Sequence, residues 1–267
     1  MKKLSIIIPV YNEEPFLRRC LNSVRESITT TNEVEVIVID DSSNDGSRSI
    51  ANEYKSQFEV ICLSDTIPRG VSFSRNCGLI AATGEYITFL DADDRYTPKA
   101  VNFMLKAADG RNIVQFNHVV WSAAKGKGIN KYKADAGRYT LPEVPPFWVG
   151  VWNKIYKRDF IEKNQIRFDK RLKYGEDELF NIDALAFCPF VDLEEYTTVI
   201  KHRDNPQSLS KTKRPDDLLQ LSQSLTHKLW TDHTAGKIAN KETYNAFIRK
   251  TIADHWGSKT FIDAFGG

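Results

Sequence analysis

Short apolar runs alternate with helical patterns along the first 116 residues of this chain. Strands are expected over residues 4–10, 34–39, 58–63, 85–90 and 113–116, with helices between them. Because the runs carry β-branched and aromatic residues and few polar ones, they are typical of strands buried on both faces. Strands that alternate with helices form right-handed βαβ units, so the pattern predicts an α/β fold with a mostly parallel sheet.

The same pattern predicts where the helices begin and end. Asn12 is expected to cap the first helix. A helix over residues 71–83 is expected to stop at Gly84, because helices favour glycine just after their last turn. Thr97 and Pro98 predict the start of a further helix after the fourth strand.

Three carboxylates, Asp91, Asp93 and Asp94, follow directly on the expected strand at 85–90. Carboxylates crowded at the end of a buried strand are costly unless a cation neutralises them. Ligands of open α/β sheets bind outside the carboxyl ends of the strands. Asp91 and Asp93 therefore predict a hard divalent cation that bridges two phosphates. The alternative is that the three aspartates only decorate a turn and cap the next helix.

Polar residues also follow the first two strands, at positions 9–13 and 40–41. Since the carboxyl ends of parallel strands lie on one edge of a sheet, these residues are expected to converge with Asp91. Asp41 can accept a hydrogen bond from a base N–H. Arg75, on the helix before the Asp-rich strand, is placed to reach a phosphate or Asp91.

Composition and charge exclude several other classes of protein. The formal net charge of the 267 residues is +2, which gives no reason to expect a nucleic acid partner. The first apolar run is broken by Pro9 and is too short for a signal peptide or a membrane span. Four widely spaced cysteines predict core thiols in a reducing compartment. A cytoplasmic location is expected, with peripheral contact at the inner face of a membrane as a possible addition.

The second half of the chain has a different pattern. Residues 121–135 predict a mobile basic loop, and residues 142–148 are rich in proline and aromatics. A strand over 151–156 and a short helix over 158–164 are expected to follow. A strong helix begins near 176, and a strand over 197–201 follows it.

Four segments of the chain, at residues 6–12, 38–46, 74–79 and 84–94, resemble the family-two glycosyltransferases. The segments stand in the family's order and spacing and cover about residues 4–115. Residues 152–156 and 175–180 extend the resemblance, less sharply, to about residue 205. No Gly-x-Gly-x-x-Gly fingerprint and no Gly-Lys-Ser/Thr loop points to another nucleotide-binding class.

The resemblance implies a GT-A fold, a UDP-sugar donor, Mg²⁺ or Mn²⁺, and inversion at the anomeric carbon. It divides the chain into a nucleotide-sugar-binding half at 1–115 and an acceptor-binding half at 116–205. Residues 206–267 are expected to form a C-terminal helical extension. The acceptor would be a glycan or a lipid-linked molecule, in polysaccharide or surface-glycan synthesis.

The resemblance also assigns site residues. Around the nucleoside and the donor sugar it places the following residues: Pro9, Tyr11, Glu13, Asp41, Arg75, Asn76, Asp91 and Ala92. Asp93 is implied as the direct metal ligand, His202 is expected to complete the metal shell, and Arg203 to hold the diphosphate. For His202 the alternative is an ordinary surface or core histidine.

Asp177 is implied as the catalytic base, with Glu176 and Glu178 as rival assignments. Its position at a helix N-terminus favours the ionised carboxylate, and the alternative is a plain N-terminal helix carboxylate. Trp148, Trp152 and Tyr174 are expected to stack on an acceptor sugar or to pack in the core. The basic residues at 211–214 would favour an anionic acceptor or a membrane surface, or would be simply solvated.

The sequence therefore predicts an inverting, metal-dependent glycosyltransferase. One alternative is a sugar-1-phosphate nucleotidyltransferase, although residues 9–13 lack the Gly-rich loop that such an enzyme should carry. A phospho-acceptor receiver module, suggested by Asp40 and Asp41, would span only about half of the chain. A non-catalytic protein that binds glycan or nucleotide is the third alternative.

Overall fold

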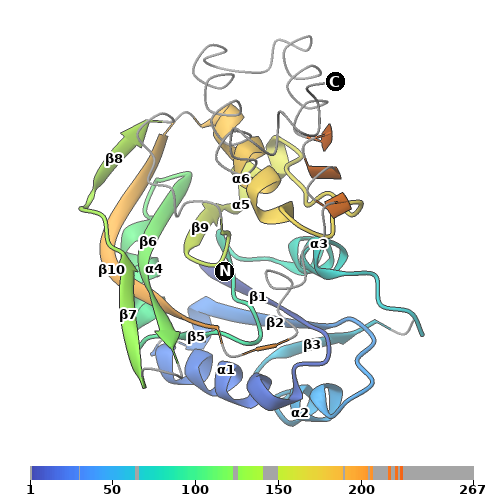
Figure 1. The fold of residues 1–267 in the computed structure, drawn as a ribbon. Helices are drawn as coiled ribbons and strands as arrows, with labels where there is room; N and C mark the ends of the chain where they lie inside the picture. Colours follow the sequence, from blue (N-terminus) through green and yellow to red (C-terminus); the bar gives the residue numbers. More distant parts are fainter. Residues whose placement is uncertain are drawn as a thin grey trace.

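The computed structural model describes residues 2–206 except 30, 64–65, 123–125, 141–149, 189 and 204, and also residues 216–217, 220–221 and 223–224. In this part the chain forms one mixed sheet with helices on both faces (Figure 1). Neighbouring strands follow the order β3-β2-β1-β4-β9-β6-β10-β5, with β7 paired to β6 and β8 paired to β10. The strands are β1 Leu4–Val10, β2 Val34–Asp40, β3 Glu59–Cys62, β4 Tyr86–Phe89, β5 Arg95–Tyr96, β6 Ile113–Ser122, β7 Lys127–Tyr132, β8 Gly137–Thr140, β9 Lys154–Lys157 and β10 Phe190–His202. The helices are α1 Glu14–Ser27, α2 Ser47–Glu53, α3 Val71–Ala81, α4 Ala100–Ala108, α5 Arg158–Lys163 and α6 Glu176–Phe187, with the 3-10 turn η1 Thr31–Glu33.

The parallel sheet predicted from the alternating pattern is confirmed for β3, β2, β1 and β4. Every residue of β1 is buried, because helices cover both faces of this part of the sheet. Alternate residues of the strand therefore enter two different cores: Ile7 lies on one side, and Ile6 and Ile8 on the other. Side chains of α1, α2 and α4 pack with Ile6, and those of α3, α5 and α6 pack with Ile7.

Pro9 is tolerated inside β1 because of where β4 ends. The carbonyl of Ile7 accepts the N–H of Leu90 at 3.0 Å, and the ladder between β1 and β4 stops there. Since backbone groups two residues apart point to the same side, the missing N–H of Pro9 faces the gap beyond β4. On its other side β1 continues to pair with β2 through Val10 and Asp40. The first strand exit is therefore open next to the Asp-rich turn.

Strand β9 joins the two halves of the sequence into one sheet. It pairs antiparallel with β4 on one side and with β6 on the other. The strand runs over Lys154–Lys157, slightly later than the expected 151–156. The expected helix at 158–164 is confirmed as α5. Residues 1–115 and 116–205 thus contribute neighbouring strands, and β9 lies directly against β4.

Three predicted helix boundaries are wrong, each for a local reason. Asn12 does not cap α1; it adopts a left-handed backbone (φ 54) and its Oδ1 accepts the N–H of Asn44 at 2.9 Å. Helix α4 begins at Ala100, after Lys99 with φ 64, and Thr97 instead donates its hydroxyl to the Thr197 carbonyl at 2.6 Å. Gly84 does not terminate α3, which ends at Ala81.

The mobile loop predicted at 121–135 is also wrong. Strand β6 extends to Ser122, and β7 folds back against it as an antiparallel hairpin. The basic composition of this stretch hid the strand pattern; Lys127, the first residue of β7, is exposed. Gly128 lies opposite Trp121, where a Cβ would meet the Val119 side chain at 2.5 Å.

Several expectations fall outside the described residues: the segment at 142–148 with Trp148, the basic residues at 211–214, and most of the expected extension at 206–267. One described residue of that extension, Leu221, is 1% exposed and packs against the turn that begins α6. Among the helices described, none combines the length and the apolar character that crossing a membrane requires.

Gly84 provides a test of how tightly β1 and β4 pack. A Cβ at Gly84 would lie 2.7 Å from the backbone nitrogen of Ser5 and 2.8 Å from the carbonyl carbon of Leu4. We expect Gly84→Ala to lower the free energy of unfolding by about 1–3 kcal/mol, because the backbone of β1 must shift. Gly137→Ala is the matched control, since its Cβ would meet nothing closer than 3.6 Å. Urea denaturation that gives both variants the same stability would contradict this packing.

Candidate active site

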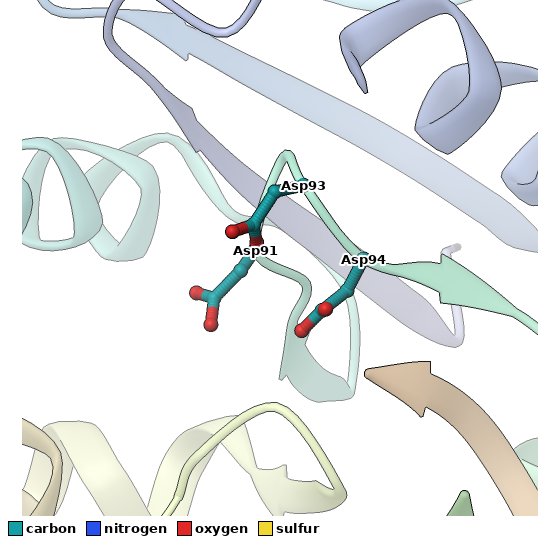
Figure 2. A group of neighbouring side chains, drawn as sticks. All are labelled: Asp91, Asp93 and Asp94. Atoms are coloured by element: carbon teal, nitrogen blue, oxygen red, sulfur yellow. The ribbon is translucent and has the colours of Figure 1, made fainter. Parts of the chain in front are cut away.

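Asp91, Asp93 and Asp94 lie in the turn that leaves β4, at the carboxyl edge of the parallel strands (Figure 2). The N–H of Asp94 donates to the Asp91 carbonyl at 3.0 Å, which closes the turn. One carboxylate oxygen from each of the three residues lies within 4.8 Å of the others. The predicted convergence of carboxylates at a strand exit is therefore present.

Lys201 places a cation among these carboxylates. It stands near the end of β10, and its ammonium group donates to Asp94 Oδ2 at 2.9 Å and to Asp91 Oδ2 at 3.2 Å. The backbone N–H of His202 donates to the other Asp94 oxygen at 2.7 Å. Sequence reasoning missed Lys201 and selected the two residues after it. The available signal was its position at the exit of an expected strand.

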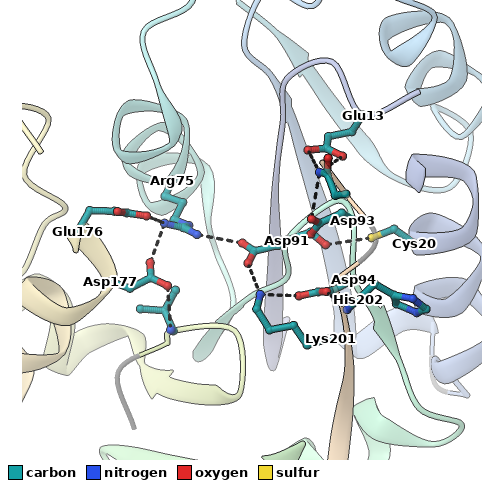
Figure 3. A network of polar contacts seen from close by, with 12 residues as sticks. Glu13, Cys20, Arg75, Asp91, Asp93, Asp94, Glu176, Asp177, Lys201 and His202 are labelled. Carbon is teal, nitrogen blue, oxygen red and sulfur yellow. Dashed lines mark hydrogen bonds and ion pairs between the residues drawn. The ribbon is translucent and has the colours of Figure 1, made fainter. Parts of the chain in front are cut away.

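Arg75 connects the aspartate turn to α6 (Figure 3). Its guanidinium, only 3% exposed, donates to Asp91 at 2.9 Å, Glu176 at 2.9 Å and Asp177 at 2.7 Å. The contact with Asp91 is one of the two that the sequence predicted for this arginine. Burial alone would raise the pKa of Asp91, but Lys201 and Arg75 hold it below its ordinary value. Asp91 is therefore an ionised carboxylate between two cations.

Asp177 lies in the first turn of α6 with its side chain 18% exposed. One oxygen accepts from Arg75, and the other from the backbone N–H of Val151 at 3.4 Å. Burial, opposed by Arg75 and reinforced by Glu176, raises the pKa of Asp177 to about 7. A carboxyl group with that pKa suits both the release and the uptake of a proton near neutral pH.

Glu13 and Asp93 meet across the first and fourth strand exits. The amide of Asn205 donates to both Glu13 oxygens at 3.2 Å and to Asp93 Oδ2 at 3.1 Å. Burial and the charge of Asp93 raise the pKa of Glu13 to about 8. Burial likewise raises the pKa of Asp93, and that of Asp94 to about 7. These three carboxyl groups therefore take up protons at a higher pH than exposed carboxyl groups do.

A divalent cation fits this donor set. Three carboxylates offer hard oxygen ligands in one small region. Burial, reinforced by the neighbouring carboxylates, raises the pKa of Asp93 and of Asp94. Asp93, which is not bound to Lys201 or Arg75 in the described contacts, is the ligand predicted from the sequence.

His202 does not belong to this group of possible ligands among the described residues. Its ring is buried, lies 6.1 Å from the Trp121 ring, and points away from Asp91 in Figure 3. Strand β10 turns the Lys201 side chain and the backbone N–H of His202 toward the carboxylates, and a role of the His202 ring in a metal shell stays a prediction.

Two other predicted donor-site residues make contacts within the fold, and their contacts with a donor stay predictions. Ala92 is 4% exposed, and its methyl group packs in the core beside α1 and α4. Asn76 uses its side-chain amide on the backbone of Phe168, donating at 2.8 Å and accepting at 3.0 Å. The contacts of Asn76 hold the segment before α6 against α3. Asn76 and Ala92 therefore support the site through backbone contacts and core packing.

Asp41 anchors the start of α3. Its carboxylate accepts the N–H groups of Arg69 and Gly70 at 2.7–3.1 Å and is 2% exposed. Tyr11 is 43% exposed beyond the first strand, and Arg203 is exposed just after β10. The contacts predicted for Asp41, Tyr11 and Arg203 with a donor remain predictions.

Two of the aromatic residues expected to stack on an acceptor sugar, Trp152 and Tyr174, differ in how deeply they are buried. Trp152 is 8% exposed and packs in the core, which was the alternative to stacking on a sugar. The Lys201 ammonium lies 4.7 Å from the centre of its ring. Such a contact between a cation and a ring face helps to fix the position of Lys201. Tyr174 is half-buried beside the α6 core.

Residues 5–187 match the model of Glycosyl transferase family 2, and the chain belongs to this family. It is 28% identical to the uncharacterized glycosyltransferase EpsJ of Bacillus subtilis over 229 residues, which cover 78% of this chain and 63% of EpsJ. It is 32% identical to the poly(ribitol-phosphate) beta-glucosyltransferase of Bacillus spizizenii over 68% of this chain and 29% of that protein. The chain thus spans less than two thirds of the length of these relatives.

The fold is that of the GT-A glycosyltransferases. The crystal structure of S. aureus TarS 1-349 in complex with UDP-GlcNAc superposes with a TM-score of 0.80 at 21% identity. The superposition covers 99% of this chain and 76% of that one. Family and fold together set aside the nucleotidyltransferase and receiver-module alternatives.

Arg75 should be indispensable to the folded state. Replacing its buried guanidinium by an apolar group leaves Asp91, Glu176 and Asp177 without their shared cation. We expect Arg75→Met to lower the free energy of unfolding by about 3–5 kcal/mol. The loss should be larger at about pH 8 than at about pH 5, because without the cation the folded state raises the carboxyl pKa values and protonation relieves the repulsion.

The control for Arg75→Met is Arg171→Met. Arg171 also pairs with a carboxylate, Asp169, but its side chain is 71% exposed. Urea denaturation should show a loss within about 1 kcal/mol for this variant. Equal losses for the two variants would contradict a special role of the Arg75 cluster.

Proposed function

We propose that the chain transfers a sugar from a UDP-sugar to a hydroxyl group of a cell-surface glycan polymer, with inversion at the anomeric carbon. The observation that carries this proposal is the contact of one guanidinium, that of Arg75, with both Asp91 and Asp177. Arg75 thereby holds two carboxylates on either side of its guanidinium: Asp91, next to the proposed diphosphate site, and Asp177, which has the pKa of a general base. The donor sugar and the acceptor hydroxyl would meet between Asp91 and Asp177.

The reaction joins the acceptor oxygen to the anomeric carbon of the sugar. Asp177 takes the proton of the acceptor hydroxyl as that bond forms. The bond from the anomeric carbon to the diphosphate breaks, and UDP leaves with the electron pair. A base on the face opposite the leaving group gives inversion, by the geometric logic that governs glycosidases. Removal of the proton by one positioned carboxylate is worth about 10²–10⁴ in rate.

Asp93, with Asp91 and Asp94 beside it, would hold Mn²⁺ or Mg²⁺, and the ion when bound would stabilise negative charge on the leaving diphosphate. The residues of this chain perform the remaining tasks. Lys201 and Arg75 keep Asp91 ionised. Glu13 and Asn205 close the side of the site next to the first strand exit.

Similarity to characterised proteins supports the choice of donor and acceptor. TarS, which has the same fold, was crystallised in complex with UDP-GlcNAc. The relative from Bacillus spizizenii is a poly(ribitol-phosphate) beta-glucosyltransferase. We infer a UDP-sugar donor and a surface polymer or its lipid-linked precursor as acceptor for this chain.

The base assignment is tested by Asp177→Asn. This variant should bind UDP with unchanged affinity in calorimetry but lose transfer by about 10²-fold or more, because the amide cannot accept the proton. Glu176→Gln tests the rival base and should retain most of the turnover. Asp159→Asn, on an 80% exposed side chain of α5, is the neutral control. Turnover of Asp177→Asn at the wild-type rate would remove Asp177 from this role.

The donor site is tested by titrating UDP into the protein with Mn²⁺ and then with EDTA. We expect binding with Mn²⁺ and at least tenfold weaker binding without it, because the carboxylate cluster otherwise repels the diphosphate. Asp93→Asn should abolish the difference between the two titrations. GDP and dTDP serve as comparison ligands. Preference for GDP would change the assigned donor, and equal binding with EDTA would contradict metal dependence.

A further inference from the structure

The segment Trp152-Asn-Lys-Ile-Tyr156 extends the family resemblance, but apart from the contact of Trp152 with Lys201 it has no role in the site described so far. Its residues Lys154 and Tyr156 are two positions apart on β9 and point to the sheet face covered by α6. Both side chains are almost completely buried, with Tyr156 at 0% and Lys154 at 1% exposure. A buried lysine and a buried tyrosine beneath α6, the helix that carries Asp177, require an explanation.

Tyr156 reaches the backbone of Asp177 through one intermediate. Its hydroxyl donates to Asn181 Oδ1 at 2.7 Å, and Asn181 Nδ2 donates to the Asp177 carbonyl at 3.0 Å. Asn181 lies four residues after Asp177 on α6, so its amide adds a bond to a carbonyl in the first turn of that helix. The tyrosine thereby ties the first turn of α6 to the sheet.

Lys154 is linked to the carboxylate of Asp177 indirectly, through the turn that precedes β9. Its ammonium donates to the Gly150 carbonyl at 2.6 Å and to Asn153 Oδ1 at 2.9 Å. These bonds fold residues 150–153 into a turn whose Val151 N–H donates to Asp177 Oδ2 at 3.4 Å. Burial lowers the pKa of Lys154 well below its usual range, and the charge of Asp177 opposes that shift.

The turn at 150–153 is fixed at its other end as well. Asn153 donates from its side chain to the Phe116 carbonyl at 3.1 Å, and its own carbonyl accepts the Phe116 N–H at 2.9 Å. A Cβ on Gly150 would lie 2.3 Å from the indole nitrogen of Trp152, so the turn packs directly on that ring. The backbone donor to Asp177 is thus held by β6, by Trp152 and by Lys154.

We propose that Tyr156 and Lys154 are positioning residues that fix Asp177 in the orientation of a general base. Tyr156 acts on the main chain through Asn181, and Lys154 acts on the carboxylate through the Val151 N–H. This inference rests on the proposed function, because it assigns Asp177 the role of base. It gives the 152–156 segment a catalytic purpose that packing alone does not require.

The first test is Tyr156→Phe, which removes one hydroxyl and keeps the ring in the core. We expect kcat to fall about 10- to 100-fold, because a displacement of about 1 Å at the reacting atoms can cost about 10² in rate. The KM for the UDP-sugar should stay within about twofold, since donor contacts are unchanged. Lys154→Met should lower kcat in the same way.

Tyr86→Phe is the matched control. Tyr86 is another buried tyrosine, on the neighbouring strand β4, but its ring lies in the core on the opposite face of the sheet. If the hydroxyl of Tyr156 only stabilises the fold, both variants should show similar kcat values and differ from the wild type only in melting temperature. That result would overturn the proposal.

A double-mutant cycle tests the route through Asn181. Asn181→Leu should reduce kcat about as much as Tyr156→Phe, and the double variant should be no slower than either single variant, because both remove the same connection. Additive losses would contradict a shared route.

A structural readout separates this inference from the proposed function. A crystal structure of Tyr156→Phe should show the Asp177 carboxylate displaced by more than about 0.5 Å, the tolerance of a productive site. An unmoved Asp177 overturns the positioning role even if the wild type proves inactive. If the wild type transfers sugar and Asp177→Asn does not, while Tyr156→Phe behaves as the wild type, the proposed function stands and this inference fails.

Discussion

The buried guanidinium of Arg75 is the contact on which the rest of the site depends. Asp91, Glu176 and Asp177 come from a turn after β4 and from the start of α6, far apart in the sequence. Three carboxylates at such short range would repel one another in a medium of low polarity. The arginine removes this repulsion and, since its planar fork offers donors in several directions, fixes where each carboxylate lies. The aspartate turn after β4 and the start of α6 are therefore one electrostatic unit.

Electrostatics also explains why the site residues have such different pKa values. Asp91, between Arg75 and Lys201, is held ionised, whereas Glu13, Asp94 and Asp177 have raised pKa values because burial outweighs their partners. Groups of one chemical type thus acquire different properties from their positions. The proposed function, which needs one carboxylate group to bind a cation and another to accept a proton, requires this separation.

The sequence predicted the parts of this arrangement that have local signals. Strand exits followed by carboxylates located Asp91 and Asp93, and the family resemblance added Asp177. Lys201, Asn205 and Asn181 were missed, because each acts through a contact with a distant segment. Of the three, Lys201 had a local signal, its position at the exit of an expected strand. The cap predicted at Asn12 and the helix start predicted at Thr97 and Pro98 were misplaced, because Asn12 and Lys99 adopt a left-handed backbone that is uncommon for residues other than glycine.

The antiparallel strand β9 between β4 and β6 has a consequence for the synthesis of the chain. The four parallel strands up to β4 are complete early in translation, but the edge of β4 remains unpaired until β9 has left the ribosome. Tyr86–Phe89 is an apolar strand, and an open edge of this kind is a template for pairing with other chains. The interval during which residues 90–153 are made is therefore the time at which a nascent molecule is most exposed to aggregation. A chaperone that covers the β4 edge would act there.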